Sequence, residues 1–296
     1  MTHPQPAPFG TRDLLVVVAM NILWGLNIIA VKMAVEAIAP LTAGFLRQML
    51  VLLVCAGSLR IVAGRMRALI ALGLLSGGLF YVAINLSLVV SDNVGALAIA
   101  GQLGVPFSML LAIIFYRERI HGPRIAGIVL AFAGVGLLVF DPAAAREGPG
   151  LALTALGSFI WAICSLIQRN LRGVPILTMY AWVGLLGSIV LGALAWMFEP
   201  AAMRAIPQLR LATLGWVAFS AIGSTVLGQG AMVWLLQRHP VSTVTPMTLA
   251  APVVAVFAAA YWFETPLGFT MLAGGAVAML GVAIVTIRTA RAEEQP

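Results

Sequence analysis

Long runs of apolar residues fill most of the chain, and short joins containing proline, glycine or charged residues separate them. A membrane-spanning helix needs about 20 predominantly apolar residues. The runs are about twice as long as a strand of a membrane β-barrel and do not alternate between polar and apolar positions. The pattern therefore predicts ten transmembrane helices, at residues 14–33, 41–60, 68–90, 95–116, 123–140, 151–170, 176–197, 211–236, 241–262 and 268–287.

The second half of the chain repeats the first. Matching residues recur 137 to 147 positions apart: Trp24 with Trp161, Pro106 with Pro252, Glu118 with Glu264, and Gly127, Ala131 and Gly134 with Gly274, Ala278 and Gly281. Because five crossings is an odd number, the second set of five helices enters the membrane from the opposite side. Inverted repeats of this kind are typical of secondary transporters, which bind substrate near the membrane midplane between the repeats.

The repeat sets the predicted domain organisation. Residues 1–13 form an N-terminal cytoplasmic tail, residues 14–140 the first repeat, residues 150–287 the second repeat and residues 288–296 a C-terminal cytoplasmic tail. The predicted fold class is an all-α membrane protein whose ten transmembrane helices form two inverted-topology five-helix repeats.

The composition favours the same class. Hydrophobic residues make up 61% of the chain and charged residues 9%, and the mean hydropathy is +1.04. A soluble domain is about 45–50% apolar and about 25% charged. The joins between the apolar runs are too short to hold a soluble catalytic domain, so the function must be built within the helices.

The charge distribution predicts the orientation. The net charge is +7, but the basic residues lie between apolar runs and form no patch, so the predicted partner is a lipid bilayer and not nucleic acid. With the N-terminus inside, twelve of the 17 Lys and Arg residues flank the cytoplasmic side, four lie on the other side, and Arg47 lies within the second run. This bias predicts a multi-pass membrane protein with both termini in the cytoplasm.

Short sequence elements carry a family resemblance. The first predicted helix contains Leu23-Trp24-Gly25-Leu26-Asn27 and then Lys32; the second has Arg47 after Pro40; both repeats have an aromatic-Glu element, at Glu118 and Glu264, before a glycine-rich helix. In their order and duplication these elements resemble the drug/metabolite transporter superfamily, specifically its ten-helix EamA-type members. The chain is most similar to bacterial aromatic amino acid exporters.

The resemblance implies a transporter with a central cavity that exports amino acids or related metabolites. The chain departs from the four-helix multidrug members of the superfamily, which carry a proton-coupling Glu in the middle of the first helix. Here the acidic residues of that helix are Asp13 and Glu36, at its two ends.

Polar and aromatic side chains inside the predicted helices are the candidate site residues, because polar groups at membrane depth usually face a cavity or a neighbouring helix. The candidate substrate-binding residues are Asn21, Trp24, Asn27, Tyr81, Asn85, Gln102, Trp161, Ser165, Gln229, Thr245 and Thr248. Hydrogen bonding between helices is the alternative role for the hydroxyls and amides, and lipid contact is the alternative for the tryptophans. Rings and amides together suit a zwitterionic small molecule with a large apolar side chain.

Three further features each have two interpretations. Arg47 either locks a helix end or backbone carbonyls, or contacts substrate. Pro106 and Pro252 each remove a helical hydrogen bond and produce either static bends or paired hinges. The small-residue stripes in residues 123–140 and 268–287 either pack these two helices together or face lipid.

Energy coupling and chemistry are inferred from where titratable residues lie. All ten Asp and Glu residues and all three His residues lie at helix ends, in joins or in tails, whereas proton-coupled transporters usually keep such a group at depth. No His-Glu-x-x-His motif or P-loop occurs, and Cys55 and Cys164 lie apart within apolar runs. The sequence therefore predicts no catalytic residues, no metal and no cofactor, and the protein is not expected to be an enzyme.

We therefore predict a monomeric membrane transporter that exports amino acids, specifically aromatic ones, by alternating access and without energy coupling. The alternative is an exporter of broader specificity for metabolites or amphipathic drugs, coupled to protons. A channel or a receptor-like scaffold stays open as a different class of function.

Overall fold

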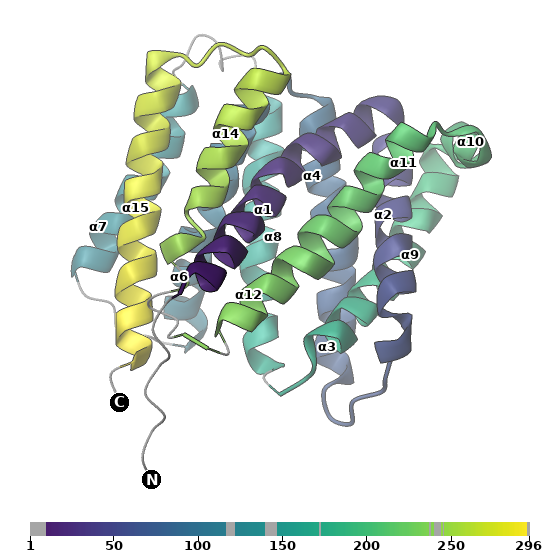
Figure 1. The fold of residues 1–296 in the computed structure, drawn as a ribbon, viewed down its shortest axis with the longest axis horizontal. Helices are drawn as coiled ribbons and strands as arrows, with labels where there is room; N and C mark the ends of the chain where they lie inside the picture. Colours follow the sequence, from purple (N-terminus) through teal and green to yellow (C-terminus); the bar gives the residue numbers. More distant parts are fainter. Residues whose placement is uncertain are drawn as a thin grey trace.

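The molecule is a bundle of long helices (Figure 1). The computed structural model describes residues 10–116, 122–139, 147–171, 173–236, 238–239, 244 and 246–294. Within these residues, eight helical segments are long and apolar enough to cross a membrane, and two shorter apolar helices span Ile125–Leu137 and Ala250–Trp262. Together they account for the ten predicted segments and confirm the all-α membrane class.

The first repeat contributes five segments. They are α1 (Thr11–Ala37); α2 (Pro40–Cys55) with the short turn η1 (Ala56–Ser58); α3 (Met66–Leu72), η2 (Gly73–Leu79) and α4 (Phe80–Val89) in one continuous segment; α5 (Val94–Ala100), η3 (Gly101–Leu103) and α6 (Gly104–Tyr116) in the next; and α7 (Gly122–Val139).

The second repeat contributes the other five. They are α8 (Gly148–Asn170); α9 (Ile176–Phe198), followed by the short α10 (Pro200–Ala205) and η5 (Ile206–Gln208); α11 (Leu211–Ala218), η6 (Phe219–Gly228) and α12 (Gln229–Leu236) in one segment; α14 (Ala250–Trp262); and α15 (Phe269–Glu294). The first helix begins and the last helix ends at the same end of the bundle (Figure 1).

The third segment of each repeat contains a π-helical stretch, which the sequence pattern did not predict. The stretches are η2 in the first repeat and η6 in the second. A π-helix bonds each N–H to the carbonyl five residues earlier, so it leaves backbone carbonyls available, and such stretches often occur at functional sites. Both stretches therefore occupy the same position in the two sequence repeats.

The two matched prolines lie at helix starts. Pro106 is in the first turn of α6, directly after the 3-10 turn η3, and Pro252 is in the first turn of α14. Pro106 thus lies inside the continuous segment Val94–Phe115, and residues 240–243 and 245 before α14 are not described, so the interpretations as static bends or paired hinges stay predictions. Proline is tolerated in the first turn of a helix, because a backbone N–H at that position would have no intrahelical acceptor.

The small-residue stripes bring α7 and α15 together, which confirms the packing interpretation. A Cβ added at Gly134 would collide with backbone atoms of Ala278, and one added at Gly127 would lie 2.9 Å from the carbonyl oxygen of Gly281. Only glycine permits so close an approach of two backbones. Likewise, a Cβ at Gly25 of α1 would lie 2.6 Å from the side chain of Val254 in α14.

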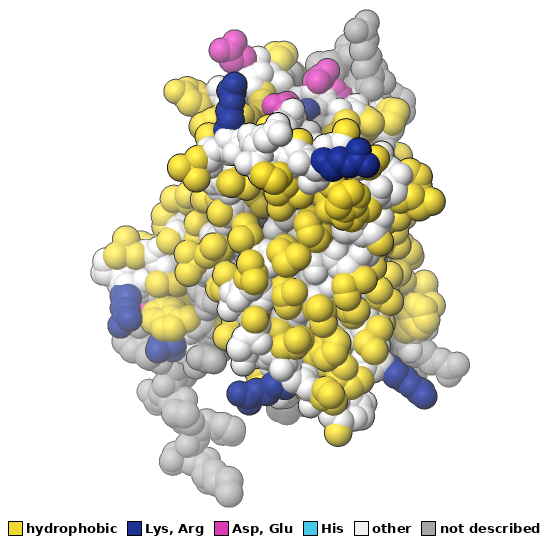
Figure 2. Space-filling view, turned by 90° about the vertical axis from the view of Figure 1, so that its right-hand side faces the viewer, with side chains coloured by type: hydrophobic (Ala, Val, Ile, Leu, Met, Phe, Trp, Pro, Cys, Tyr) yellow, Lys and Arg dark blue, Asp and Glu magenta, His cyan; other side chains and the backbone are white. Residues whose placement is uncertain are grey.

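A broad apolar band covers the outer surface between the two ends of the bundle. In the face shown in Figure 2, hydrophobic side chains fill the middle of the molecule, and the basic and acidic side chains gather near its ends. Large apolar side chains such as Leu53, Ile114, Phe257 and Leu280 are each more than half exposed. Such a band matches the hydrocarbon core of a membrane.

Replacing Gly134 by alanine tests the contact between α7 and α15. We expect Gly134→Ala to lower the melting temperature of the detergent-solubilised protein, because overpacking costs about 1–3 kcal/mol. Gly136→Ala is the matched control on the same helix, since a Cβ there would meet nothing within 4 Å. It should leave the melting temperature unchanged or raise it, because alanine favours helix by about 1 kcal/mol. Equal effects of the two substitutions would contradict the packing described.

Candidate functional site

A central cavity lies between helices of both repeats. It encloses about 390 Å³, and aromatic and polar side chains from α1, α2, α8 and α9 and from the segments containing η2 and η6 line it. The lining residues are Trp24, Asn27, Arg47, Gln48, Val51, Ser76, Phe80, Tyr81, Ile84, Gly101, Ser158, Trp161, Tyr180, Val183, Ser224, Thr225 and Gln229. A volume of this size falls at the lower end of the range for small-molecule sites.

A second cavity adjoins the first. It encloses about 350 Å³ and shares Trp24, Ile84 and Gly101 with the central cavity. Its own lining includes Gln102 and Thr248 and is otherwise mostly apolar. The two cavities thus meet beside Trp24 of α1.

The two π-helical stretches supply backbone acceptors to cavity side chains. Gln48 Nε2 donates to the Gly77 carbonyl oxygen in η2 at 3.1 Å, and Trp24 Nε1 donates to the Ser224 carbonyl oxygen in η6 at 3.2 Å. In a membrane interior such carbonyls have no water to bond, so a side-chain donor compensates for the departure from regular helix. The irregular backbone thereby fixes the orientation of two cavity residues.

Arg47 projects from α2 toward the second π-helical stretch. Its Nε donates to Ser220 Oγ at 2.9 Å and its Nη2 to Thr225 Oγ1 at 2.6 Å. The guanidinium carbon lies 4.1 Å from the centre of the Tyr81 ring, which is a cation–π contact. Arg47 therefore bonds side-chain hydroxyls and faces the central cavity, whereas one sequence-based interpretation had it locking a helix end or backbone carbonyls.

Most of the predicted site residues line these cavities. The central cavity contains Trp24, Asn27, Tyr81, Trp161 and Gln229, and the second cavity contains Trp24, Gln102, Thr248 and Pro252. They come from six transmembrane segments and from both repeats. This placement agrees with the rule that polar groups at membrane depth face a cavity or a neighbouring helix, and substrate binding by these residues stays a prediction.

Three predicted residues form hydrogen bonds to backbone carbonyls and line neither of these two cavities, so their part in substrate binding stays a prediction. Asn21 Nδ2 donates to the Val17 carbonyl oxygen one turn earlier, and Asn85 Nδ2 donates to the Pro40 carbonyl oxygen at the start of α2. Ser165 Oγ donates to the carbonyl oxygen of Ala162 and lies 3.1 Å from the hydroxyl of Ser108 in α6. These are the bonds within and between helices that the alternative interpretation anticipated.

Thr245 of the candidate set lies outside the described residues, as does Glu118 of the repeated aromatic-Glu element.

Many residues that line the central cavity were missed by the sequence reasoning, and four of them are informative. Gln48, Ser76, Phe80 and Tyr180 all line the central cavity. Gln48 is an amide at membrane depth and satisfies the same rule that selected Asn85. Ser76 lies within η2, whose π-helical geometry has no signature in the hydrophobic pattern, and Tyr180 lies in an otherwise apolar run that gives no sign of which face is buried.

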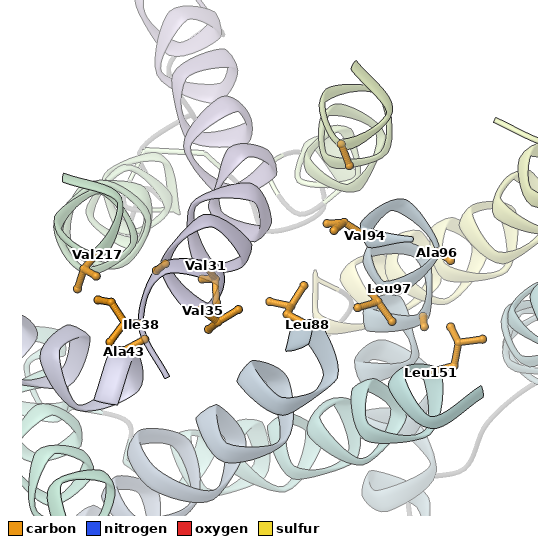
Figure 3. Packing of buried hydrophobic residues seen from close by; sticks show 13 residues of the cluster. Val31, Val35, Ile38, Ala43, Leu88, Val94, Ala96, Leu97, Leu151 and Val217 are labelled. Carbon is orange, nitrogen blue, oxygen red and sulfur yellow. The ribbon is translucent and has the colours of Figure 1, made fainter. Parts of the chain in front are cut away.

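An apolar cluster closes the bundle at the end where α1 finishes. Val31 and Val35 of α1 and Ile38 directly after it pack there with side chains from α2, α4, α5, α8, α11 and α14 (Figure 3). The buried Lys32 lies beside this cluster, and its Nζ donates to the carbonyl oxygens of Leu88 at 2.8 Å and Ser91 at 2.7 Å. A cation is favourable at the carbonyl end of a helix, so Lys32 joins α1 to the end of α4.

Charged groups cap other helix ends nearby. The carboxylate of Glu199 accepts from the backbone N–H groups of Leu41 and Thr42 and from the Thr42 hydroxyl, at the start of α2. The carboxylate of Glu147 accepts from the N–H groups of Asp92 and Asn93. An anion stabilises the N–H groups that a helix start leaves unbonded. Among the described residues, no group of three or more His, Cys, Asp or Glu side chains could hold a metal ion.

Comparison with known proteins gives one family. The model of the EamA-like transporter family matches residues 11–140 and again residues 148–287. An uncharacterized transporter of Archaeoglobus fulgidus is 30% identical over 91% of this chain and 97% of its own length. A probable amino-acid metabolite efflux pump of Escherichia coli is 27% identical over 93% of both chains, and one of Salmonella typhimurium is 25% identical over 92% of this chain and 94% of its own length.

A solved crystal structure has the same overall fold. It superposes with a TM-score of 0.64 at 18% sequence identity and covers 96% of this chain and 99% of the other. At this identity the likeness concerns the fold alone.

Cysteine labelling tests whether the central cavity is reachable by water. In a Cys55→Ala/Cys164→Ala background, we expect Ser76→Cys to react with a small water-soluble methanethiosulfonate reagent, because Ser76 lines the cavity. Ser188→Cys is the matched control, since Ser188 is equally buried but bonds to the carbonyl of its own helix and lines neither cavity. The readout is the mass increase of the intact protein, and equal labelling at the two positions would contradict this cavity wall.

Proposed function

The chain belongs to the EamA-like transporter family, and on that premise we propose that it exports amino acids with a large aromatic side chain across the bacterial inner membrane. The observation that carries this proposal is the central cavity, where the rings of Trp24, Phe80, Tyr81 and Trp161 meet the amide groups of Asn27 and Gln229. Flat rings stack favourably on a substrate ring, and amides hydrogen-bond its polar end. The names of the two enteric relatives, probable amino-acid metabolite efflux pumps, support the same substrate class.

The transport mechanism we propose is alternating access between two inverted repeats, residues 14–140 and 150–287, in a monomer. Supporting it, equivalent helices pair across the bundle: α7 packs on α15 and α2 packs on α9. The start of α1 and the end of α15 share one end of the molecule, which fits two odd-numbered repeats of opposite orientation (Figure 1). The excess of Lys and Arg on that side supports the proposal that both termini lie in the cytoplasm.

In this proposal the apolar cluster around Val31 and Leu88 closes the periplasmic end, and the cavities open toward the cytoplasm. For the protein to open to the periplasm, the side chains of this cluster must separate. The hydrogen bonds from Lys32 to the carbonyl oxygens of Leu88 and Ser91 must break as well. The 3-10 turn before Pro106 and the turn before Pro252 are the two breaks at which the helices can bend during that change.

We propose that transport is not coupled to protons. Within the described part of the chain, neither cavity is lined by an Asp, a Glu or a His. A proton-driven carrier needs a group that gains and loses a proton on the transport path. The protein would therefore let its substrate equilibrate down the substrate's own gradient.

Uptake into proteoliposomes tests this function. We expect saturable uptake of labelled tryptophan and phenylalanine that stops when the two sides are equal, and much slower uptake of threonine. An imposed pH gradient should change neither the rate nor the end point. Concentrative uptake under that gradient would overturn the absence of coupling, and preferential uptake of non-aromatic metabolites or amphipathic drugs would favour an exporter of broader specificity.

Replacing Trp161 tests the aromatic wall. The Trp161 ring lies 5.6 Å from the Phe80 ring, centre to centre, and is partly open to the cavity. We expect Trp161→Ala to raise the KM for tryptophan several-fold and up to about tenfold, because an aromatic contact is worth about 0.5–1.5 kcal/mol and 1.4 kcal/mol corresponds to a factor of ten. Ser165→Ala, on the same helix but with its hydroxyl bonded to Ala162, is the control and should leave the KM within about twofold of wild type. A similar KM in both variants would count against the proposed site.

A further inference from the structure

Arg47 is a buried cation with neutral partners. Its side chain is 7% exposed, and it bonds the hydroxyls of Ser220 and Thr225 and lies over the ring of Tyr81. Among the residues that the structure describes, no carboxylate forms an ion pair with it. The positive charge is therefore held in place by groups that do not neutralise it.

Such a charge is costly inside a membrane unless an anion joins it. A guanidinium keeps its proton in proteins, and a charged side chain at membrane depth usually pairs with another charge or marks a substrate path. The two hydroxyl bonds use two of its five N–H groups, and the residue lines the central cavity. A carboxylate entering this cavity can accept from the remaining N–H groups in the side-by-side geometry that arginine favours.

The repeat does not duplicate this charge. At the offset of 137 that relates Trp24 to Trp161, Arg47 corresponds to Gly184. A Cβ at Gly184 would lie 2.6 Å from the backbone nitrogen of Leu52, so α9 uses this position to approach α2 closely. The close packing of α9 on α2 requires a glycine at position 184 of α9. It does not require an arginine at position 47 of α2, so packing alone does not explain Arg47.

Two amide oxygens at the same cavity lack a hydrogen-bond donor. Gln48 Oε1 and Asn27 Oδ1 are both buried and both unbonded. The orientation of the Gln48 amide is fixed, because its nitrogen donates to the Gly77 carbonyl oxygen and a carbonyl accepts only from a donor. Both residues line the central cavity, and the Gln48 side chain is fully buried. The wall beside Arg47 thus offers acceptors that suit a bound cation.

We propose that Arg47 binds the α-carboxylate of the substrate and that the amide oxygens of Gln48 and Asn27 accept from its ammonium group. The substrate side chain then lies among the rings of Phe80, Tyr81 and Trp161, which line the same cavity. This assignment rests on the proposed function and makes it more specific. The site selects zwitterions for two reasons. A ligand without a carboxylate leaves Arg47 without an anion, and a ligand without an ammonium group leaves the two amide oxygens without a donor.

The test compares three ligands that share an indole ring. Tryptophan carries both charged groups, tryptamine lacks the carboxylate, and indole-3-propionate lacks the ammonium group. In wild-type proteoliposomes we expect tryptamine and indole-3-propionate to inhibit uptake of labelled tryptophan at least tenfold more weakly than unlabelled tryptophan does. This comparison uses the unaltered protein and does not depend on the folding of any variant.

The Arg47→Gln variant then identifies the residue responsible. It should bind tryptophan at least tenfold more weakly but tryptamine as before, so that the preference between the two collapses, as measured by ligand-induced shifts in melting temperature. Arg47→Lys should restore part of the preference, because it keeps the charge without the paired donors. Arg204→Gln, at an exposed arginine of α10, is the control and should keep the wild-type preference.

The outcomes separate this assignment from the proposed function. If wild-type protein transports tryptophan but tryptamine competes equally well, or if Arg47→Gln keeps the wild-type preference, the carboxylate assignment is wrong and the function stands. If wild-type protein neither transports nor binds aromatic amino acids, the function and the assignment are overturned together.

Discussion

Inside a bilayer every backbone N–H and carbonyl group must find its partner within the protein, and this constraint explains where the structure departs from regular helix. Backbone carbonyls in the π-helical stretches η2 and η6 accept from Gln48 and Trp24. The carbonyls at the end of α4 accept from Lys32, and the N–H groups at the start of α2 donate to Glu199. Each irregular point is thus matched by a side chain from another helix.

The same pairing of backbone and side chain builds the cavity. Arg47 and Gln48 are neighbours on α2, yet one reaches η6 and the other reaches η2, so a single turn of helix touches the irregular stretch of both repeats. The scaffold is repeated, but the polar groups that line it are not. In the proposed alternating-access mechanism, this combination would let the repeats exchange roles while one set of side chains holds the substrate throughout.

The sequence predicted the scaffold well because hydrophobic length and repetition are direct consequences of the bilayer. The ten segments followed from the apolar runs, and the close contact of Gly134 with Ala278 followed from matched small residues. The orientation of individual polar side chains was harder to predict. Asn85 and Gln48 are both amides at depth, and which one faces the cavity depends on the π-helical stretch and on the Pro40 carbonyl, neither of which the pattern reveals.

Substrate counterflow tests the central claim most directly. Proteoliposomes preloaded with unlabelled tryptophan and diluted into a trace of labelled tryptophan should transiently accumulate the label, because a carrier that reorients with bound substrate exchanges one molecule for another. Vesicles preloaded with threonine, and vesicles without protein, should not. Label that only equilibrates at the same rate under every loading condition would contradict a tryptophan-binding carrier and would instead indicate a channel.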